Sequence, residues 1–139
     1  MKNQIAVKEN THNRLIELQG KLKTNKTHRH FGKNMNEVVN FLLSYFSHAE
    51  SERKQDKDLE NIFQQLTLPD SKEKILNNHI VVKKEIYDKT IKLLYSFRAN
   101  ETYRKFGRDL NTVIEFLLAY FYIDQARKFG ENKTFLDNL

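Results

Sequence analysis

The stretch FGKNMNEVVNFLLSYF, from Phe31 to Phe46, returns 75 residues later as FGRDLNTVIEFLLAYF, from Phe106 to Phe121. Extended without a gap, this match places residues 5–46 on residues 80–121, and 17 of the 42 positions are identical. Such an ungapped match indicates a duplicated supersecondary unit. Two copies are too few for a solenoid, which needs about three repeats to bury a continuous core. The repeat therefore predicts an intramolecular pseudo-dimer, in which each copy covers the apolar face of the other.

Each copy opens with a short β-branched segment, IAVK at residues 5–8 and IVVK at residues 80–83. Side chains alternate between the two faces of a strand, so one face of this pair is apolar and buried. A lone strand of this length is unstable, and the strand candidate available as a partner is the other copy. The buried face is predicted to hold Ile5, Val7, Ile80 and Val82. The outer face is predicted to hold Gln4, Ala6, Lys8, His79, Val81 and Lys83.

Two helices follow the strand in each copy. The first is predicted over about Thr11–Lys23 and Ile86–Ala99, with Asn10 or Thr11 as the first N-cap. The second begins after Asn34 or Asp109, whose side chains can accept hydrogen bonds from free backbone N–H groups. It is apolar almost all round, so the two copies are expected to bury it against each other. The apolar stripe of the first helix comprises Leu15, Ile16, Leu18 and Leu22, matched by Thr90, Ile91, Leu93 and Phe97.

The repeat divides the chain into four parts: unit one (1–47), a charged helical bridge (48–78), unit two (79–123) and a tail (124–139). Leu59, Ile62, Phe63 and Leu66 give the bridge a small apolar face, which either packs on the core or meets a protein partner. Helix two of the second unit is predicted to extend to about Lys128. The fold class predicted is mostly α, with one two-stranded antiparallel ribbon.

The composition of the chain limits the classes of function that we expect. The net charge is +6, which favours acidic partners and nucleic acid first. The absence of cysteine excludes disulfides, thiol catalysis and cysteine-based zinc sites. No run of 18 apolar residues and no apolar leader is present, so we expect a soluble cytoplasmic protein without a membrane partner.

Other site types are disfavoured. His28 and His30 invite a metal interpretation, but Tyr103 and Lys105 replace them in the second copy and no ligand set is completed. No phosphate loop or nucleophile motif is present, so neither an enzyme nor a cofactor is expected. The aromatic residues have helical spacing and are assigned to the core rather than to stacking on single strands. They are Phe41, Tyr45, Phe46, Phe116, Tyr120 and Phe121.

The order of strand, helix, glycine turn and buried helix resembles a ribbon-helix-helix unit. The resemblance rests on IAVK at residues 5–8, THNRLIEL at 11–18 and GKNMNEVV at 32–39, and it covers about 84 of the 139 residues. The chain is thus similar to tandem, TraY-type members of the Arc/MetJ superfamily. That family reads double-stranded DNA with an antiparallel ribbon in the major groove.

The resemblance implies two sets of DNA contacts. The outer face of the ribbon would contact bases through Gln4, Ala6, Lys8, His79, Val81 and Lys83. The start of helix two would bind phosphate through Arg29, Lys33, Asn34, Arg104, Arg108 and Asp109.

The implied role is a transcriptional repressor or a plasmid or mobile-element accessory protein of the relaxosome type, associated with the nucleoid. Self-association on DNA and a domain-swapped homodimer stay open. Two other function classes also stay open. One is an antitoxin, in which the bridge or the tail would bind and inhibit a toxin partner and the ribbon would autoregulate. The other is an interaction module that binds no DNA.

Overall fold

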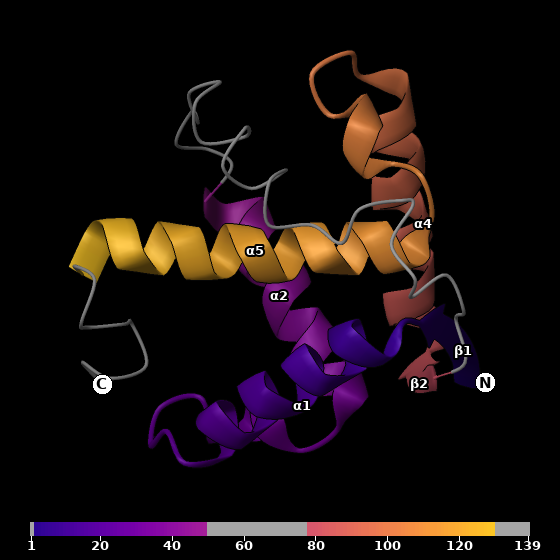
Figure 1. Cartoon of the computed structure of the whole chain (residues 1–139). Helices are drawn as coiled ribbons and strands as arrows, with labels where there is room; N and C mark the ends of the chain where they lie inside the picture. Colours follow the sequence, from indigo (N-terminus) through magenta and orange to yellow (C-terminus); the bar gives the residue numbers. More distant parts are fainter. Residues whose placement is uncertain (1, 50–77, 130–139) are drawn as a thin grey trace.

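The structure is a computed structural model of the chain, and it describes residues 2–49 and 78–129 (Figure 1). The described part is mostly helical, with one two-stranded antiparallel sheet. The first half contains β1 (Lys2–Val7), α1 (Glu9–Lys23), the 3₁₀ turn η1 (Arg29–Gly32) and α2 (Met35–Ala49). The second half contains β2 (Asn78–Lys83), α4 (Lys84–Ala99), η2 (Arg104–Phe106) and α5 (Leu110–Phe129).

The two strands pair in a register that is symmetric about one residue pair. Ile5 lies opposite Ile80, its counterpart in the repeat, and the pairs Gln4–Val81 and Ala6–His79 flank it. The predicted inner residues, Ile5, Val7, Ile80 and Val82, are all at most 1% exposed. The predicted alternation of the two strands is therefore confirmed.

The first helix of each half begins earlier than predicted, at Glu9 in α1 and at Lys84 in α4. Neither Asn10 nor Thr11 is the N-cap, because both already lie within the first turn of α1. Lys8 and Lys83 occupy the cap positions, without a side-chain capping bond. Thr11 is instead buried and donates its hydroxyl to Glu115 Oε1 at 3.0 Å.

The buried stripes of α1 and α4 differ from prediction at Ile16, Ile91 and Leu93, which are not buried, and at Thr11, Ile86 and Leu94, which are. Ile16 is 47% exposed, and Leu94 rather than Leu93 is the more buried residue on α4. Successive residues of an α-helix point about 100° apart, so a stripe cannot hold both Leu15 and Ile16 in full contact with one core. The observed stripes are Thr11, Leu15, Leu18 and Leu22 on α1, and Ile86, Thr90, Leu94 and Phe97 on α4.

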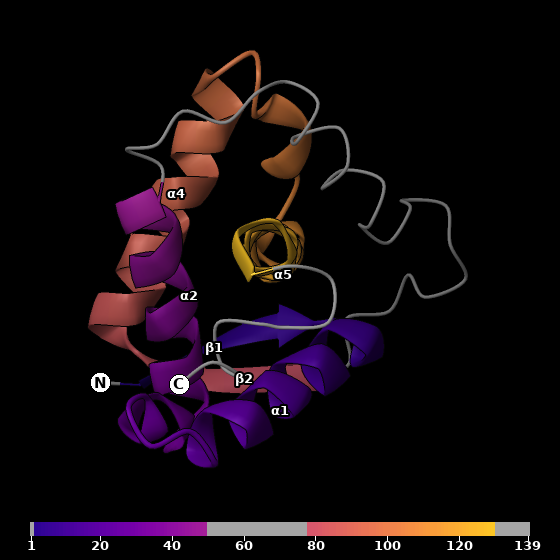
Figure 2. The ribbon, with the colours of Figure 1, turned by 90° about the vertical axis from the view of Figure 1, so that its left-hand side faces the viewer.

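Helices α2 and α5 cross at the centre of the molecule, and α1 and α4 pack around them (Figures 1 and 2). Both predicted N-caps are confirmed: Asn34 Oδ1 accepts the N–H of Glu37 at 3.0 Å, and Asp109 Oδ1 accepts that of Thr112 at 2.7 Å. The aromatic rings belong to the core, as predicted. The ring of Phe46 lies 5.3 Å from that of Phe116 and 4.9 Å from that of Tyr120.

Helix α5 ends at Phe129, one residue beyond the predicted end at Lys128. The apolar face predicted for the bridge lies outside the described residues. Within residues 2–49 and 78–129, no helix is both long and apolar enough to cross a membrane.

Candidate nucleic-acid interface

The outer face of the ribbon is open to solvent. Gln4, His79, Val81 and Lys83 are exposed, and Ala6 is half-buried between them. Cross-strand neighbours point to the same side of an antiparallel pair, so these side chains form one surface. The ribbon lies at the edge of the molecule, to the right in Figure 1, with its apolar face against the helices.

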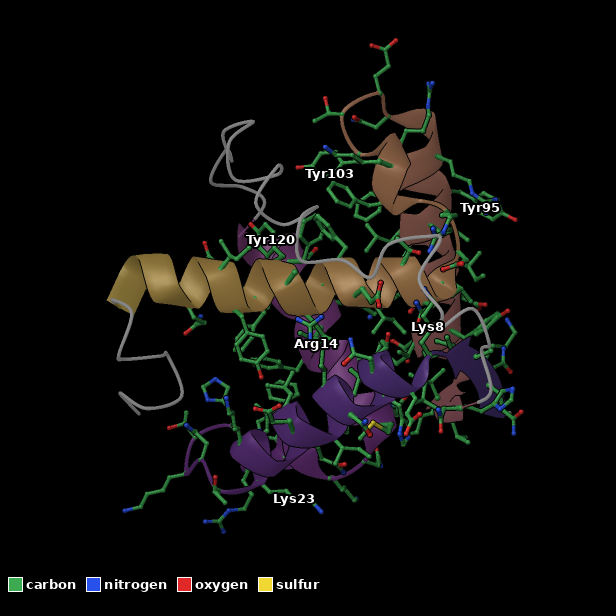
Figure 3. All side chains as sticks on the ribbon, viewed as in Figure 1. Lys8, Arg14, Lys23, Tyr95, Tyr103 and Tyr120 are labelled. Atoms are coloured by element: carbon green, nitrogen blue, oxygen red, sulfur yellow. The ribbon has the colours of Figure 1, made fainter. Side chains whose placement is uncertain are left out.

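Lys8 does not belong to this surface, which corrects the sequence prediction. Lys8 follows β1 and immediately precedes α1, as Lys83 immediately precedes α4. Lys8 is only 5% exposed and lies between the ribbon and α5 (Figure 3). Its counterpart Lys83 is still part of β2 and is exposed. The identical residue therefore has two different environments in the two halves.

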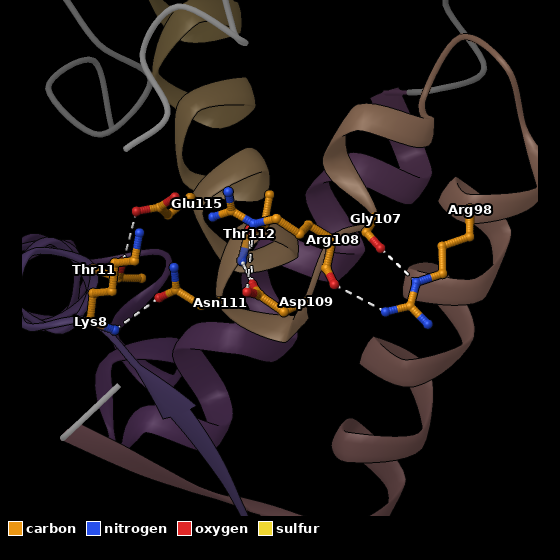
Figure 4. Close-up of polar contacts among 9 residues, drawn as sticks. All are labelled: Lys8, Thr11, Arg98, Gly107, Arg108, Asp109, Asn111, Thr112 and Glu115. Atoms are coloured by element: carbon orange, nitrogen blue, oxygen red, sulfur yellow. Dashed lines mark hydrogen bonds and ion pairs between the residues drawn. The ribbon is translucent and has the colours of Figure 1, made fainter. Parts of the chain in front are cut away.

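One asparagine at each strand end forms a hydrogen bond that joins the strand of one half to the second helix of the other half. Asn111 Oδ1 accepts the backbone N–H of Lys8 at 2.9 Å (Figure 4), and Asn36 Oδ1 accepts that of Lys83 at 2.8 Å. The two bonds are equivalent in the repeat. Asn36 and Asn111 are 7% and 0% exposed; the bond at Asn111 is buried and the bond at Asn36 is partly buried. They place the N-terminus of α5 at the end of β1 and the N-terminus of α2 at the end of β2.

Sequence reasoning missed these strand–helix bonds, although a signal was present. Asn36 and Asn111 are identical in the two copies and stand at the start of an otherwise apolar run. A buried polar side chain needs a hydrogen-bond partner. Two asparagines at equivalent positions of a buried helix therefore indicate that each forms a hydrogen bond with a nearby backbone group.

A glycine turn carries the chain from the first helix to the second in each half. A Cβ on Gly32 would lie 2.7 Å from the backbone nitrogen of Lys23, and one on Gly107 would lie 3.0 Å from that of Arg98. The turn thus passes directly against the end of the preceding helix. In the second half Arg98 also holds it, donating from Nε to Gly107 O at 2.7 Å and from Nη2 to Arg108 O at 3.0 Å (Figure 4).

The turns bring the predicted phosphate-binding residues to the helix N-termini. Lys33 and Asn34 precede α2, and Arg108 and Asp109 precede α5. Arg29 and Arg104 lie in the 3₁₀ turns η1 and η2. All of these side chains are exposed except that of Asp109, which is half-buried.

The two helix N-termini differ in charge. Arg108 Nε lies 3.7 Å from Asp109 Oδ2, and both side chains are more than a third exposed, so this ion pair is weak. Lys33 forms no ion pair with any residue in the described ranges, and Asn34 is uncharged. A carboxylate favours a helix N-terminus but repels a phosphate approaching the same N–H groups.

His28 belongs to the packing of its turn. Its ring stacks on Phe31, with 6.1 Å between the ring centroids, and lies nearly perpendicular to the ring of Phe41, with 5.9 Å between the centroids. Burial, and then the nearby His30, lower the pKa of His28. Among residues 2–49 and 78–129, no group of three or more histidine, cysteine or acidic side chains is placed to hold a metal ion.

Comparisons of the chain with protein-family models, curated proteins and solved structures found no match.

Proposed function

We propose that the chain consists of two fused ribbon-helix-helix units that form a single-chain pseudo-dimer and bind duplex DNA in a sequence-specific manner. The observation that carries this proposal is the pair of equivalent strand–helix bonds, Lys8 to Asn111 and Lys83 to Asn36. Each bond joins one half to the other. Together with the register centred on Ile5 and Ile80, they present one open ribbon face between two helix N-termini.

The open face suits the major groove of B-DNA, which is about 12 Å wide and admits a two-stranded ribbon. Gln4 can form two hydrogen bonds with adenine, and Lys83 can donate to guanine. Ala6 and Val81 offer apolar contact to thymine methyl groups. The two halves of the ribbon differ at equivalent positions, since Gln4 corresponds to His79 and Ala6 to Val81, and this gives each half a different reading surface.

Phosphate binding would come from the residues at the helix N-termini. Free N–H groups and the positive end of the helix dipole attract anions there. The exposed cations Arg29, Lys33, Arg104 and Arg108 lie in or beside the two turns. The net charge of +6 adds general attraction to a polyanion.

Within this function, the role that we propose is a repressor or a plasmid or mobile-element accessory protein. The tandem layout resembles proteins that mark an operator or a transfer origin. A site on DNA read by two unequal half-ribbons is an asymmetric or imperfectly palindromic element, because a symmetric dimer reads a palindrome through identical halves.

Titration of a labelled mixed-sequence duplex at several salt concentrations tests the proposal, followed by selection of bound sequences from random duplex DNA. We expect a negative salt slope and an enriched motif. On the selected site, Lys83→Ala should weaken binding by about 1–3 kcal/mol while binding to random duplex weakens less.

If the chain did not bind duplex DNA, or bound it independently of salt, the proposal would be contradicted. The interaction module that binds no DNA would then be the remaining function class. Stoichiometric co-purification of a toxin that the chain inhibits would instead support the antitoxin class.

A further inference from the structure

The two ends of the ribbon carry different exposed charge, although the repeat makes them equivalent. We call the end where β2 meets the start of α2 the α2 end, and the end where β1 meets the start of α5 the α5 end. The strand–helix bonds define both ends, through Lys83 and Asn36 at the first and Lys8 and Asn111 at the second.

The α2 end is cationic. Lys33, Lys83 and Lys84 are exposed there, and the accompanying carboxylates are those of Glu37 and the exposed Glu85, which lies 3.6 Å from Lys89 Nζ. Glu37 is half-buried and accepts a hydrogen bond from Asn36 Nδ2 at 3.2 Å. Lys84 pairs with Asp88 one turn further along α4, at 3.0 Å, but both side chains are more than half exposed. Such a pair contributes little and leaves the lysine able to contact phosphate.

The α5 end has lost cations at the equivalent positions. Lys8 is buried, and Glu9 occupies the position of Lys84. Asp109 replaces Asn34 as the N-cap and lies beside Arg108. The solvent-accessible charges at these positions are therefore one cation, Arg108, and two carboxylates, Glu9 and Asp109. Arg98 lies nearby, with its guanidinium hydrogen-bonded to the two carbonyls of the turn.

We propose that the chain binds duplex DNA with a fixed polarity, in which the α2 end is the main phosphate anchor and the α5 end a weak one. This inference rests on the proposed function. Phosphates on either side of the major groove would meet a cationic helix start at one end of the ribbon and an acidic cap at the other. The DNA half-site at the α2 end would then set affinity, and the other half-site would tolerate more sequence change.

Equivalent residues provide matched variants. Asn34→Asp and Asp109→Asn exchange the caps, and both residue types cap helices well, so each variant should keep its fold. Lys33→Ala and Arg108→Ala remove one exposed cation at each end. The probe is a short labelled duplex of mixed sequence, titrated at several salt concentrations, with thermal unfolding of each variant as the control for folding.

We expect Lys33→Ala to reduce the salt slope by about 0.9, as for the loss of one phosphate contact, and Arg108→Ala to reduce it by less than half as much. Asp109→Asn should strengthen binding, and Asn34→Asp should weaken it to a greater extent than Asp109→Asn strengthens it. Equal slope changes for Lys33→Ala and Arg108→Ala would overturn the polarity and leave DNA binding intact. Absence of salt-dependent binding by the unaltered chain would overturn both proposals.

Discussion

Helices α2 and α5 arise from the most similar part of the repeat, yet their surroundings differ. Along α2, Ser44 and Ser47 are exposed and Leu43 is half-buried. On α5, every residue from 111 to 121 is buried, including the counterparts Leu118 and Ala119. The same apolar pattern therefore forms one face of the core in the first half and its centre in the second. Similarity of sequence sets which helix forms, and the neighbours decide how much of it is covered.

The C-terminal part of α5 makes contacts for which we find no counterpart among the described residues of α2. Tyr45 donates its hydroxyl to the Asp124 carboxylate, and Gln125 Nε2 donates to Tyr45 Oη at 2.6 Å. Burial, and then the hydrogen bond to Asp124, raise the pKa of Tyr45. The Nζ atom of Lys21 on α1 lies 5.1 Å from the ring centroid of Tyr122. The C-terminal part of α5 thus joins α1 and α2.

The largest expected effect comes from removing the second half altogether. A fragment of residues 1–50 would expose Val38, Leu42 and Phe46, which are at most 3% exposed in the whole chain. We expect it to form a homodimer or to stay largely unfolded, as measured by sedimentation and circular dichroism beside the whole chain. A folded monomeric fragment would show that the two halves do not depend on each other.

The next effect compares equivalent rings in the two central helices. Phe116 is 0% exposed and lies 4.6 Å from Phe106 and 5.0 Å from Phe97, between ring centroids. Phe41 is 5% exposed, and its centroid lies 5.3 Å from that of Phe121. Phe116→Ala should cost about 3–5 kcal/mol of unfolding free energy, and Phe41→Ala less. Urea denaturation measures both, and an equal loss would mean that α5 is no more central than α2.

A smaller effect comes from the two asparagines. Asn111→Ala and Asn36→Ala should each cost about 1–3 kcal/mol, because a backbone N–H loses its acceptor. The cost should be larger for Asn111, since Lys8 is buried whereas the exposed Lys83 can turn to water. Urea denaturation of the two variants side by side measures both losses of unfolding free energy. A larger loss for Asn36→Ala would contradict the inference that the bond to Lys8 is the more buried of the two.

The smallest effect at neutral pH concerns Tyr122, whose counterpart Ser47 is exposed. Burial, and then the Glu17 carboxylate, raise the pKa of Tyr122 to about 12, above the value of about 10 in an unfolded chain. Its neutral form is favoured in the fold, so this stability is complete below about pH 10 and is lost as the pH rises towards 12.

Tyr122→Phe should therefore lose less stability than the unaltered chain across that range in alkaline unfolding experiments. Tyr95, which is 59% exposed, supplies the control variant Tyr95→Phe, expected to behave like the unaltered chain. Identical alkaline profiles for Tyr122→Phe and the unaltered chain would show that this hydroxyl does not couple to folding.

Sequence patterns predicted those features that depend on neighbours along the chain. Alternation identified Ile5, Val7, Ile80 and Val82 as the inner face of the ribbon, and local capping chemistry identified Asn34 and Asp109. The patterns failed where the environment comes from the other half. Thr11 has the chemistry of a cap, but it bonds to Glu115, which is 104 residues away.

Lys8 and Lys83 show the same limit most clearly within the candidate site. Both follow the same apolar segment and both were assigned to the outer face. The first is 5% exposed and the second is exposed, although each is followed directly by a helix and each donates its backbone N–H to an asparagine. Lys8 and Lys83 have nearly the same backbone conformation, with φ −73° and ψ 156° for Lys8 and φ −72° and ψ 155° for Lys83. Alternation therefore cannot distinguish them, and the elements packed around each lysine decide which one is covered.

The pairing of β1 with β2 inside one polypeptide has a consequence for behaviour on dilution. A ribbon assembled from two separate chains is lost as the concentration falls below its dissociation constant, so the amount of complete ribbon depends on expression level. Here each molecule carries both strands, and the ribbon forms by a first-order step. A cell holding very few copies would still have every one of them complete.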